Sequence, residues 1–407
     1  MRAVFVNHCH PDTPHVCATR MREFAWAMAR RGHQIVLLTE TLDGSPDEMP
    51  PDAVAEDIRR HDFSSPYYLA CPPSGASAAR KLRDGGLPWG IRQAVILWLF
   101  YRHHGVFTDW LLGARPMLEP LAVEFKPDLV WGTFGNTDCW NISRELAHLA
   151  SCPWIADIKD PWQIFIPRLL QARLARRYAD AALMTAFSST HAAAADAYFS
   201  HDKKVIPSGV DPTPIAQAKV KSTDGDIWIS LTGSVYAPES NSSLLSAIAG
   251  WVTRLDDSTR SRITFRYAGD EAEAVDERLG QLKSLINTRV QGRLPQQDYF
   301  DLLRSCRLNL YITNQNTFHQ KTLELLSVDR PAASFPGETD EAIGIADQYG
   351  CTLYSCATAD DLARALDSAL SIPEAAAKSG LEDAYSWDAL AEKLEDVFNA
   401  ILEDGTN

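Results

Sequence analysis

Short apolar runs alternate with longer segments of helical periodicity along the whole chain. This alternation is typical of parallel sheets covered by helices on both faces, so the sequence predicts an α/β protein. In the first half, the apolar runs predict strands at 3–6, 35–39, 129–131, 154–156, 182–184 and 205–206. The periodic segments between them predict helices at 19–31, 117–124, 137–150, 167–178 and 190–199.

The second half repeats this pattern after a stretch rich in proline, glycine and charge that begins at Pro207. Its predicted strands lie at 227–231, 263–267, 288–291, 308–312, 331–335 and 352–354. Its predicted helices lie at 242–254, 275–286, 296–305, 318–328, 340–348 and 359–369. Two similar domains joined by one linker imply a cleft, and ligands of such sheets bind at the carboxyl ends of the strands.

These patterns predict the organisation of the chain. We expect a first domain at 1–207, a linker at 208–225 and a second domain at 226–384. The last segment, 385–407, is expected to form an amphipathic helix that packs back on the first domain. A length of 407 residues fits this division, because one hydrophobic core seldom organises so long a chain.

Charge and cysteine content narrow the classes of function. The formal charge of −14, without any cluster of Lys and Arg, argues against nucleic-acid binding. Eight cysteines without a CxxC pair are typical of a reducing compartment. Since the first apolar run is also too short for a signal peptide, we expect a cytoplasmic protein.

The most apolar run, 94–101, is flanked by arginine and histidine. It is far shorter than the roughly 20 residues of a membrane span. A core or interdomain helix is the common explanation of such a run. The alternative is contact with a membrane interface, which would make the protein peripheral at the inner membrane surface.

Lys321 and Glu324 are the clearest candidates for a functional site, because they lie in the otherwise apolar run 316–326. Positions i and i+3 share a helix face, and an unpaired charge there carries a desolvation cost. An ammonium in the first turn suits a phosphate, together with the backbone N–H groups of 317–320. A carboxylate one turn later suits vicinal hydroxyls. The pair therefore indicates a nucleotide-sugar, with a salt bridge between the two side chains as the alternative.

Two strand ends in the second half are candidates for contact with the same ligand. Gly233 would let the backbone approach a phosphate, and Ser234 would add a hydroxyl donor. The segment 291–295 could present backbone to a flat base. For each of these segments, a plain turn is the alternative.

The first half offers polar groups after three predicted strands. The segment 7–17 lacks the glycines of the GxGxxG fingerprint, which argues against a dinucleotide, and its His and Cys residues match no usual metal-ligand spacing. We therefore expect neither a metal nor a cofactor, and His8 is a candidate hydrogen-bond partner or proton carrier. Asp157 and Asp160 could hold sugar hydroxyls, with helix capping as the alternative, and Trp162 could stack on an acceptor.

Taken together, several motifs resemble those of the GT-B glycosyltransferases, specifically the retaining group called family 4. The segment 18–39 resembles the first βαβ unit of that family. The other matching motifs are the KPDvv strand at 126–130, the DxRDPW turn at 157–162 with Lys159 for Arg, and the vIPNGvD exit at 205–211 with Ser208 for Asn. The resemblance runs nearly end to end and implies two Rossmann-like domains that face each other across a cleft.

The resemblance also implies roles for individual residues. The implied catalytic residues are Lys321, which would neutralise the donor diphosphate, Glu324, which would bind the ribose, and Asp160. The implied donor-binding residues are Gly233, Ser234, Arg293, Leu294, Asn316, Thr317, Phe318, His319 and Gln320. The implied acceptor-binding residues are His8, His10, Arg20, Asn136, Asp157 and Trp162. Asn316 departs from the family pattern, because it occupies the first Glu position of the E-x7-E motif.

We therefore expect a metal-independent glycosyltransferase that moves a sugar from a nucleoside-diphosphate sugar to an acceptor hydroxyl, with retention of anomeric configuration. The base, the sugar and the acceptor are left open, and the acceptor could be a glycan, a lipid-linked glycan or a small molecule. One alternative is a sugar-nucleotide epimerase of the same fold. Another is a degenerate transferase that acts as a binding or scaffold protein, which Asn316 favours, because an amide cannot stabilise developing positive charge.

Overall fold

The structure is a computed structural model, which describes residues 1–42, 50–74, 78–105, 108–223, 225–233, 235, 238–313, 317–371 and 379–404. It divides into two compact units. Unit 1 comprises Met1–Ser208 with Trp387–Asn407, and unit 2 comprises Gly209–Ser386. The stretch predicted as a linker, 208–225, belongs almost entirely to unit 2.

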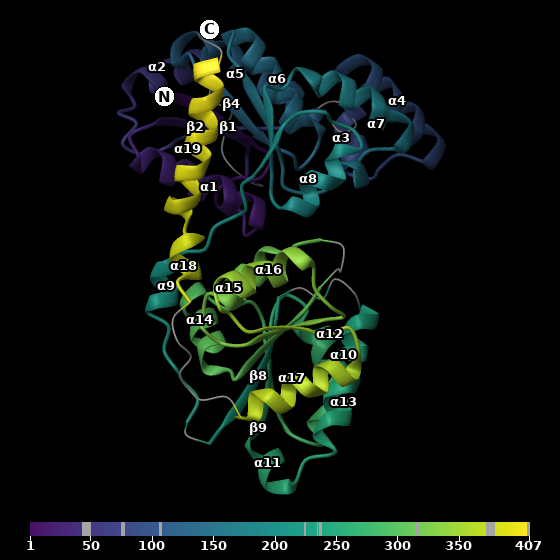
Figure 1. Cartoon of the computed structure of the whole chain (residues 1–407). Coiled ribbons are helices and arrows are strands. Elements are labelled where there is room, and N and C mark those ends of the chain that lie inside the picture. The colour runs from purple at the N-terminus through teal and green to yellow at the C-terminus, as the bar shows by residue number, and fades with distance from the viewer. Residues whose placement is uncertain are drawn as a thin grey trace. The chain divides into compact units, whose positions relative to one another are not determined.

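Unit 1 is built on a parallel sheet of seven strands in the order β3-β2-β1-β4-β5-β6-β7 (Figure 1). The strands are β1 (Arg2–Asn7), β2 (Gln34–Glu40), β3 (Tyr67–Cys71), β4 (Leu129–Thr133), β5 (Trp154–Ile158), β6 (Leu183–Ala186) and β7 (Lys203–Val205). Phe5 of β1 is in register with Leu37 of β2 and Trp131 of β4, and all three side chains are buried. The sheet is therefore buried along its centre, which is why its strands are apolar without alternation.

The helices of unit 1 are α1 (Val16–Arg30), α2 (Pro51–Arg60), α3 (Ala78–Arg83), α4 (Trp89–His103), α5 (Asp109–Pro120), α6 (Thr137–Ala150), α7 (Arg168–Arg177), α8 (Ser189–Asp196) and α19 (Trp387–Asp404). Three short helical segments accompany them: η1 (Leu121–Phe125), η2 (Trp162–Ile164) and η3 (Tyr178–Asp180). The prediction for α6 is confirmed at both ends. Asn136 begins this helix by accepting hydrogen bonds from the N–H groups of Asp138 and Cys139, and Ser151 ends it in the left-handed conformation.

The apolar pattern predicts no element at β3, α2 or α3. For the run 94–101, which lies in α4, it predicts a core or interdomain helix, and the burial of this run is only partial. Within α4, Ile96, Leu99 and Phe100 are buried, but Leu97 and Trp98 are exposed. Among the described residues, no helix combines the length and the apolar composition that crossing a bilayer requires.

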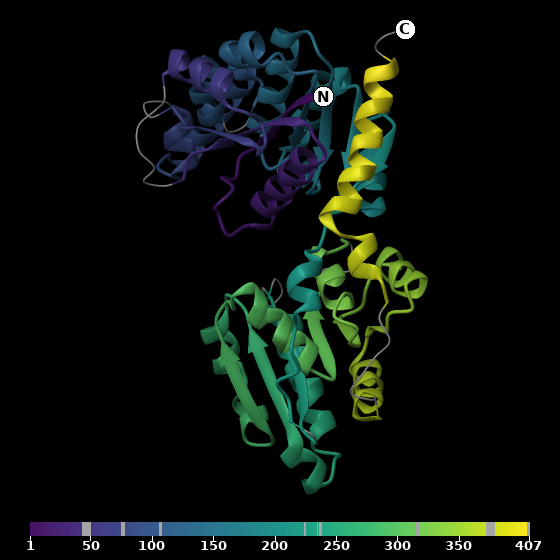
Figure 2. The same cartoon turned by 90° about the vertical axis from the view of Figure 1, so that its left-hand side faces the viewer.

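The C-terminal helix α19 completes the core of unit 1. It lies along α1, as the yellow and purple helices show (Figures 1 and 2). Trp387 packs edge to face on Phe24 with ring centroids 5.3 Å apart, and Phe398 contacts Phe5 and Trp131. The last helix therefore covers the apolar face of β1 and β4 that α1 alone leaves open.

Unit 2 is built on a parallel sheet of six strands in the order β10-β9-β8-β11-β12-β13. The strands are β8 (Ile227–Thr232), β9 (Ile263–Ala268), β10 (Asn287–Gln291), β11 (Leu308–Ile312), β12 (Ala332–Phe335) and β13 (Leu353–Ser355). The helices are α9 (Pro212–Ala216), α10 (Pro238–Val252), α11 (Asp257–Arg262), α12 (Ala272–Arg278), α13 (Gly280–Lys283), α14 (Gln296–Ser305), α15 (Gln320–Leu326), α16 (Asp340–Gln348), α17 (Ala359–Ser371) and α18 (Leu381–Ala384). The predicted fold class is confirmed: each unit is a Rossmann-like α/β layer structure.

Two helix predictions in unit 2 were wrong in extent. The segment 275–286 forms two short helices, because the chain leaves helical geometry at Leu279 before Gly280. The helix predicted at 318–328 is the shorter α15. His319 has extended backbone angles, so α15 begins only at Gln320, and Asp329 beyond its end has a positive φ of 53°.

A buried ion pair in the core of unit 1 also holds residues 206–208, where the chain leaves this unit. Arg20 of α1 pairs with Asp157 of β5 at 2.9 Å, and both side chains are fully buried. Arg20 also donates to the carbonyl of Ile206 (2.9 Å) and to the hydroxyl of Ser208 (3.3 Å). The hydroxyls of Thr133 and Thr185 donate to Asp157, each at 2.7 Å. The pair is thus satisfied by hydrogen bonds, which is the condition under which buried charges are tolerated.

Arg20→Met should therefore be strongly destabilising, because it leaves Asp157 buried without its cation. We expect a loss of about 3–5 kcal/mol, against about 0–1 kcal/mol for Arg30→Met, which breaks the exposed pair of Arg30 with Asp388. Urea denaturation followed by tryptophan fluorescence measures both, since nine of the eleven tryptophans lie in unit 1. Equal losses in the two variants would contradict a structural role for the buried pair.

Candidate functional site

The candidate site in unit 2 is centred on Gly233 and Lys321, which two neighbouring parallel strands bring to one edge of the sheet. Gly233 follows β8, and Lys321 lies in α15 after β11, the neighbour of β8. A Cβ on Gly233 would lie 2.5 Å from Nζ and 2.8 Å from Cε of Lys321. The ammonium therefore occupies the space that a side chain at position 233 would take. The positive φ of Gly233, 90°, is a second reason for glycine here.

Hydrogen bonds fix the backbone around Gly233. Its N–H donates to the carbonyl of Ala268 (3.0 Å), and its own carbonyl accepts from the hydroxyl of Tyr267 (2.9 Å). Glu271 accepts from the N–H of Val235 at 3.2 Å. A Cβ on Gly269 would lie 2.5 Å from the carbonyl oxygen of Gly233. The loop after β8 is thus held in one conformation beside the lysine.

Lys321 has no ion-pair partner in the described part of the chain. Its Nζ lies 5.2 Å from the ring centroid of Tyr299, whose hydroxyl donates to Oε2 of Glu324 at 3.1 Å. No described ion pair joins Lys321 to Glu324, so the alternative of a salt bridge between them is wrong for this structure. A half-buried ammonium without a carboxylate partner is suited to an anionic ligand.

Burial shifts both titratable groups away from their charged forms. It lowers the pKa of Lys321 and raises the pKa of Glu324. The two charges partly offset these shifts, because Glu324 raises the pKa of Lys321 and Lys321 lowers the pKa of Glu324. Arg293 acts on both groups and lowers the pKa of each. The three residues therefore share one electrostatic environment.

The other predicted donor-site residues lie around this centre. Arg293 is exposed after β10, and Leu294 packs against the apolar cluster of Ala268, Leu302 and Cys306. Thr317 and His319 are half-buried, Phe318 is buried, and the side-chain amide of Gln320 donates to the carbonyl of Gly209 (2.7 Å). Ser234 and Asn316 lie outside the described residues.

Sequence reasoning missed the residues that support the site. Tyr299 and Tyr267 contact Glu324 and Gly233 from α14 and β9, and neither is marked by any local motif. Each occupies a position where a buried aromatic would serve the core equally well. Their roles emerge only from contacts between residues that are 25 and 34 positions apart in sequence.

In unit 1, His8 and Asn136 meet at the ends of β1 and β4. A Cβ on Gly135 would lie 1.9 Å from Cε1 of His8, so the imidazole rests directly on that glycine. The side chain of Asn136 accepts a hydrogen bond from the N–H of Cys139. Sγ of Cys139 lies 3.8 Å from Nδ1 of His8. Polar groups are thus gathered at this edge of the sheet, where parallel sheets bind ligands.

Burial limits several of the other unit 1 predictions. Arg20, Asp157 and Trp162 are fully buried. The first two pair with each other, and Trp162 packs among Trp140, Tyr198 and Phe199. These three residues therefore contribute to the structure of unit 1, and their contact with an acceptor stays a prediction.

Two further predicted residues are accessible but engaged. Asp160 accepts from the ammonium of Lys159 with both oxygens at 3.2 Å. Nδ1 of His10 accepts from the N–H of Asp12 at 3.2 Å. Asp160 therefore faces solvent with its charge already balanced by a neighbour in the same loop.

Comparisons with known proteins identify the fold. No protein-family model matches the chain, and no curated protein matches it in sequence. Among solved structures, it is similar to HepE from Anabaena in complex with UDP and glucose (14% identity, TM-score 0.61, covering 98% of this chain and 100% of that one). It is also similar to an α,α-trehalose 6-phosphate synthase from Burkholderia multivorans (12%, TM-score 0.67, 100% and 97%). A third is described as a putative UDP-N-acetylglucosamine 2-epimerase from Listeria monocytogenes (11%, TM-score 0.56, 99% and 97%).

At these low identities, the likeness shows the fold, which is GT-B. This agrees with the architecture expected from the sequence motifs. It does not extend by itself to a substrate or a reaction.

The raised pKa of Glu324 leads to a stability prediction. Since folding disfavours the carboxylate, Glu324→Gln should raise the unfolding temperature at pH 7 while keeping an acceptor for Tyr299. This increase in unfolding temperature should be largest above the folded-state pKa of Glu324. It should disappear below the unfolded-state pKa of about 4.3.

Calorimetry at pH 7 and near pH 4 measures the difference, with Glu277→Gln on the exposed face of α12 as the matched control. The control should show little change at either pH. A lower unfolding temperature for Glu324→Gln at pH 7 would show that its carboxylate stabilises the ligand-free unit.

Proposed function

We propose that the protein is a glycosyltransferase that moves a sugar from a nucleoside-diphosphate sugar to an acceptor hydroxyl. The observation that carries this proposal is the ammonium of Lys321, which lies over the backbone of Gly233 without a carboxylate partner among the described residues. A diphosphate fits this arrangement, because the missing side chain of the glycine makes room for an ammonium that phosphate oxygens can contact. That HepE was crystallised with UDP and with UDP-glucose supports the choice of ligand.

The proposed chemistry is stabilisation of the leaving group. Lys321 donates to the departing diphosphate, and a charge-assisted hydrogen bond of this kind contributes about 1.5–3 kcal/mol. Glu324 accepts hydrogen bonds from the ribose hydroxyls with Oε1, because Tyr299 already donates to Oε2. A diphosphate oxygen takes the acceptor proton, so no separate base is required. The ammonium provides the positive charge at the leaving group, and the proposal therefore needs no metal ion.

The finer features follow the resemblance in the sequence motifs. We propose retention of anomeric configuration, membership of the family 4-like group, a role for Asp160 near the transferred sugar, and acceptor contacts from His8, His10 and Asn136. We also propose a cytoplasmic location, which the eight free cysteines support.

The second candidate is a sugar-nucleotide epimerase, which the similarity to the Listeria structure favours. Both enzymes would bind the donor at the same residues, but only the transferase needs an acceptor. Incubation with UDP-sugars and product analysis separate them: free UDP and a glycosylated acceptor support transfer, whereas an isomerised UDP-sugar formed without an acceptor supports epimerisation. Binding without either product would leave a scaffold role.

Nucleotide binding tests the proposal. In a titration with UDP, GDP, ADP and TDP, we expect one nucleotide to raise the unfolding temperature, since ligand at 100 times its Kd stabilises by about 2.7 kcal/mol. Lys321→Ala should weaken the binding of that nucleotide roughly 10- to 150-fold, because one charge-assisted hydrogen bond is lost. Gly233→Ala should weaken it as well, because its methyl group would displace the ammonium.

Lys283→Ala, which removes an exposed lysine of the same unit, is the matched control and should bind like the wild type. With the preferred donor, Lys321→Ala should also lower turnover by orders of magnitude while the fold is retained. Wild-type affinity and turnover in Lys321→Ala would contradict the proposed site.

A further inference from the structure

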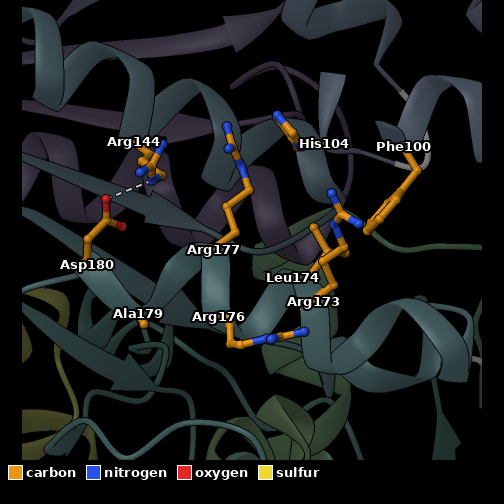
Figure 3. Close-up of a pocket in the computed structure, with 9 residues that line it drawn as sticks. All are labelled: Phe100, His104, Arg144, Arg173, Leu174, Arg176, Arg177, Ala179 and Asp180. Carbon is orange, nitrogen blue, oxygen red and sulfur yellow. Dashed lines mark ion pairs between the residues drawn. The ribbon is translucent and has the colours of Figure 1, made fainter. Parts of the chain in front are cut away.

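A cavity lined by arginines lies in unit 1, whereas the candidate donor site belongs to unit 2. The volume of the cavity is about 750 Å³. Figure 3 shows Arg144 of α6 and Arg173, Arg176 and Arg177 of α7 around it, with His104, which follows α4. Asp180 is the one carboxylate among its lining residues, and it pairs with Arg144 at 2.7 Å.

The α7 arginines are left without carboxylate partners among the described residues. Nε of Arg177 donates to the side-chain oxygen of Asn141 (3.1 Å), and Nε of Arg176 donates to the carbonyl of Ala172 (3.3 Å). Arg173 lies over the ring of Tyr101 at 4.9 Å. Three guanidinium groups without a carboxylate ion pair among the described residues thus line one cavity, which suits a phosphate or another multivalent oxyanion.

The electrostatic environment of His104 agrees with this excess of positive charge. Burial lowers its pKa, and the charges of Arg177, Arg173 and Arg144 lower it further. Burial also lowers the pKa of Arg177 and Arg144 lowers it further, while Asp180 and Glu145 offset part of this shift. An anion in the cavity would relieve the repulsion among these cations.

The cavity adjoins an exposed apolar face of α4. The face comprises Ile91, Leu97, Trp98 and Tyr101, of which Tyr101 is 60% exposed. Tyr101 joins the face to the cavity, because Arg173 lies over its ring. Leu169 at the start of α7 is 95% exposed and adds to the apolar surface beside the arginines. Tryptophan and tyrosine are the side chains typical of the boundary between bilayer and water.

The local charge opposes the charge of the whole chain. Residues 78–104 contain five Lys and Arg and one Asp, and residues 161–178 contain four Arg and no acidic residue. The chain as a whole has a formal charge of −14. A cationic apolar surface on an acidic protein is complementary to an anionic bilayer, which attracts basic side chains and accepts aromatic ones.

We propose that α4 and the arginine cavity dock unit 1 on a bilayer that contains anionic phospholipids, with a lipid phosphate held by Arg173, Arg176 and Arg177. In this arrangement, Trp98 and Tyr101 enter the interface beside the bound headgroup. The inference uses only residues of unit 1 and does not depend on the proposed reaction. Its failure would therefore leave the donor site untouched.

Flotation with lipid vesicles tests the docking. We expect the full chain to float with vesicles of phosphatidylcholine and phosphatidylglycerol and to stay unbound with phosphatidylcholine alone. Arg173→Gln/Arg176→Gln should weaken binding about 30-fold, since each basic residue near an anionic surface contributes about fivefold. Leu97→Ala/Trp98→Ala should also weaken it.

Arg59→Gln/Arg60→Gln is the matched control, because these exposed arginines of α2 already pair with Glu124 and Glu56. It should bind like the wild type, and all variants should keep the wild-type response to nucleotide. Since all four residues of the two test variants are exposed, the fold should survive, and circular dichroism checks this.

Equal binding to both kinds of vesicle, or unchanged binding in both test variants, would overturn the proposal. Titration calorimetry with inorganic pyrophosphate is a second experiment, which measures whether the cavity binds a soluble phosphate compound. Tight pyrophosphate binding that is lost in Arg173→Gln/Arg176→Gln, without flotation of the wild type, would assign the cavity to a soluble phosphate compound and not to a membrane.

Discussion

The candidate site depends on the absence of one methyl group. Gly233 adopts a positive φ and leaves open the space that the ammonium of Lys321 fills, with only 2.5 Å between Nζ and the position of a Cβ. The parallel pairing of β8 with β11 sets the distance between the two residues, and the hydrogen bond from Tyr267 holds the glycine carbonyl. A lysine placed in this way is neither neutralised nor freely solvated. It therefore keeps a charge that a diphosphate can use.

Similar residue types serve opposite purposes in the two units. In unit 1, Arg20 has a structural role, because its guanidinium donates hydrogen bonds to Asp157, Ile206 and Ser208. In unit 2, Lys321 is given no such partners among the described residues, and burial opposes its charge. Retaining an unpaired cation costs stability, and this cost is characteristic of a binding site. Arg20 and Lys321 therefore differ in whether neighbouring groups pair with the cation, and not only in how far the cation is buried.

The sequence predicted the parts of the fold that depend on local pattern. Apolar runs located the central strands, and the caps of α6 fixed its ends because Asn136 and Ser151 act within one turn. The position of Lys321 and Glu324 on one helix was also predictable from their spacing. The burial of Arg20 was not, since its partner is 137 residues away. Tyr299 was missed for the same reason, and the exposure of Trp98 could not be read from an apolar run.

We expect a diphosphate to bind beside Gly233, in contact with the ammonium of Lys321. A crystal structure of the chain with UDP would show where it binds. Phosphate oxygens should lie at about 2.7–2.9 Å from Nζ of Lys321, the length of a charge-assisted hydrogen bond, with the ribose hydroxyls at Glu324. A diphosphate bound elsewhere, with the ammonium of Lys321 unchanged beside Gly233, would contradict this expectation.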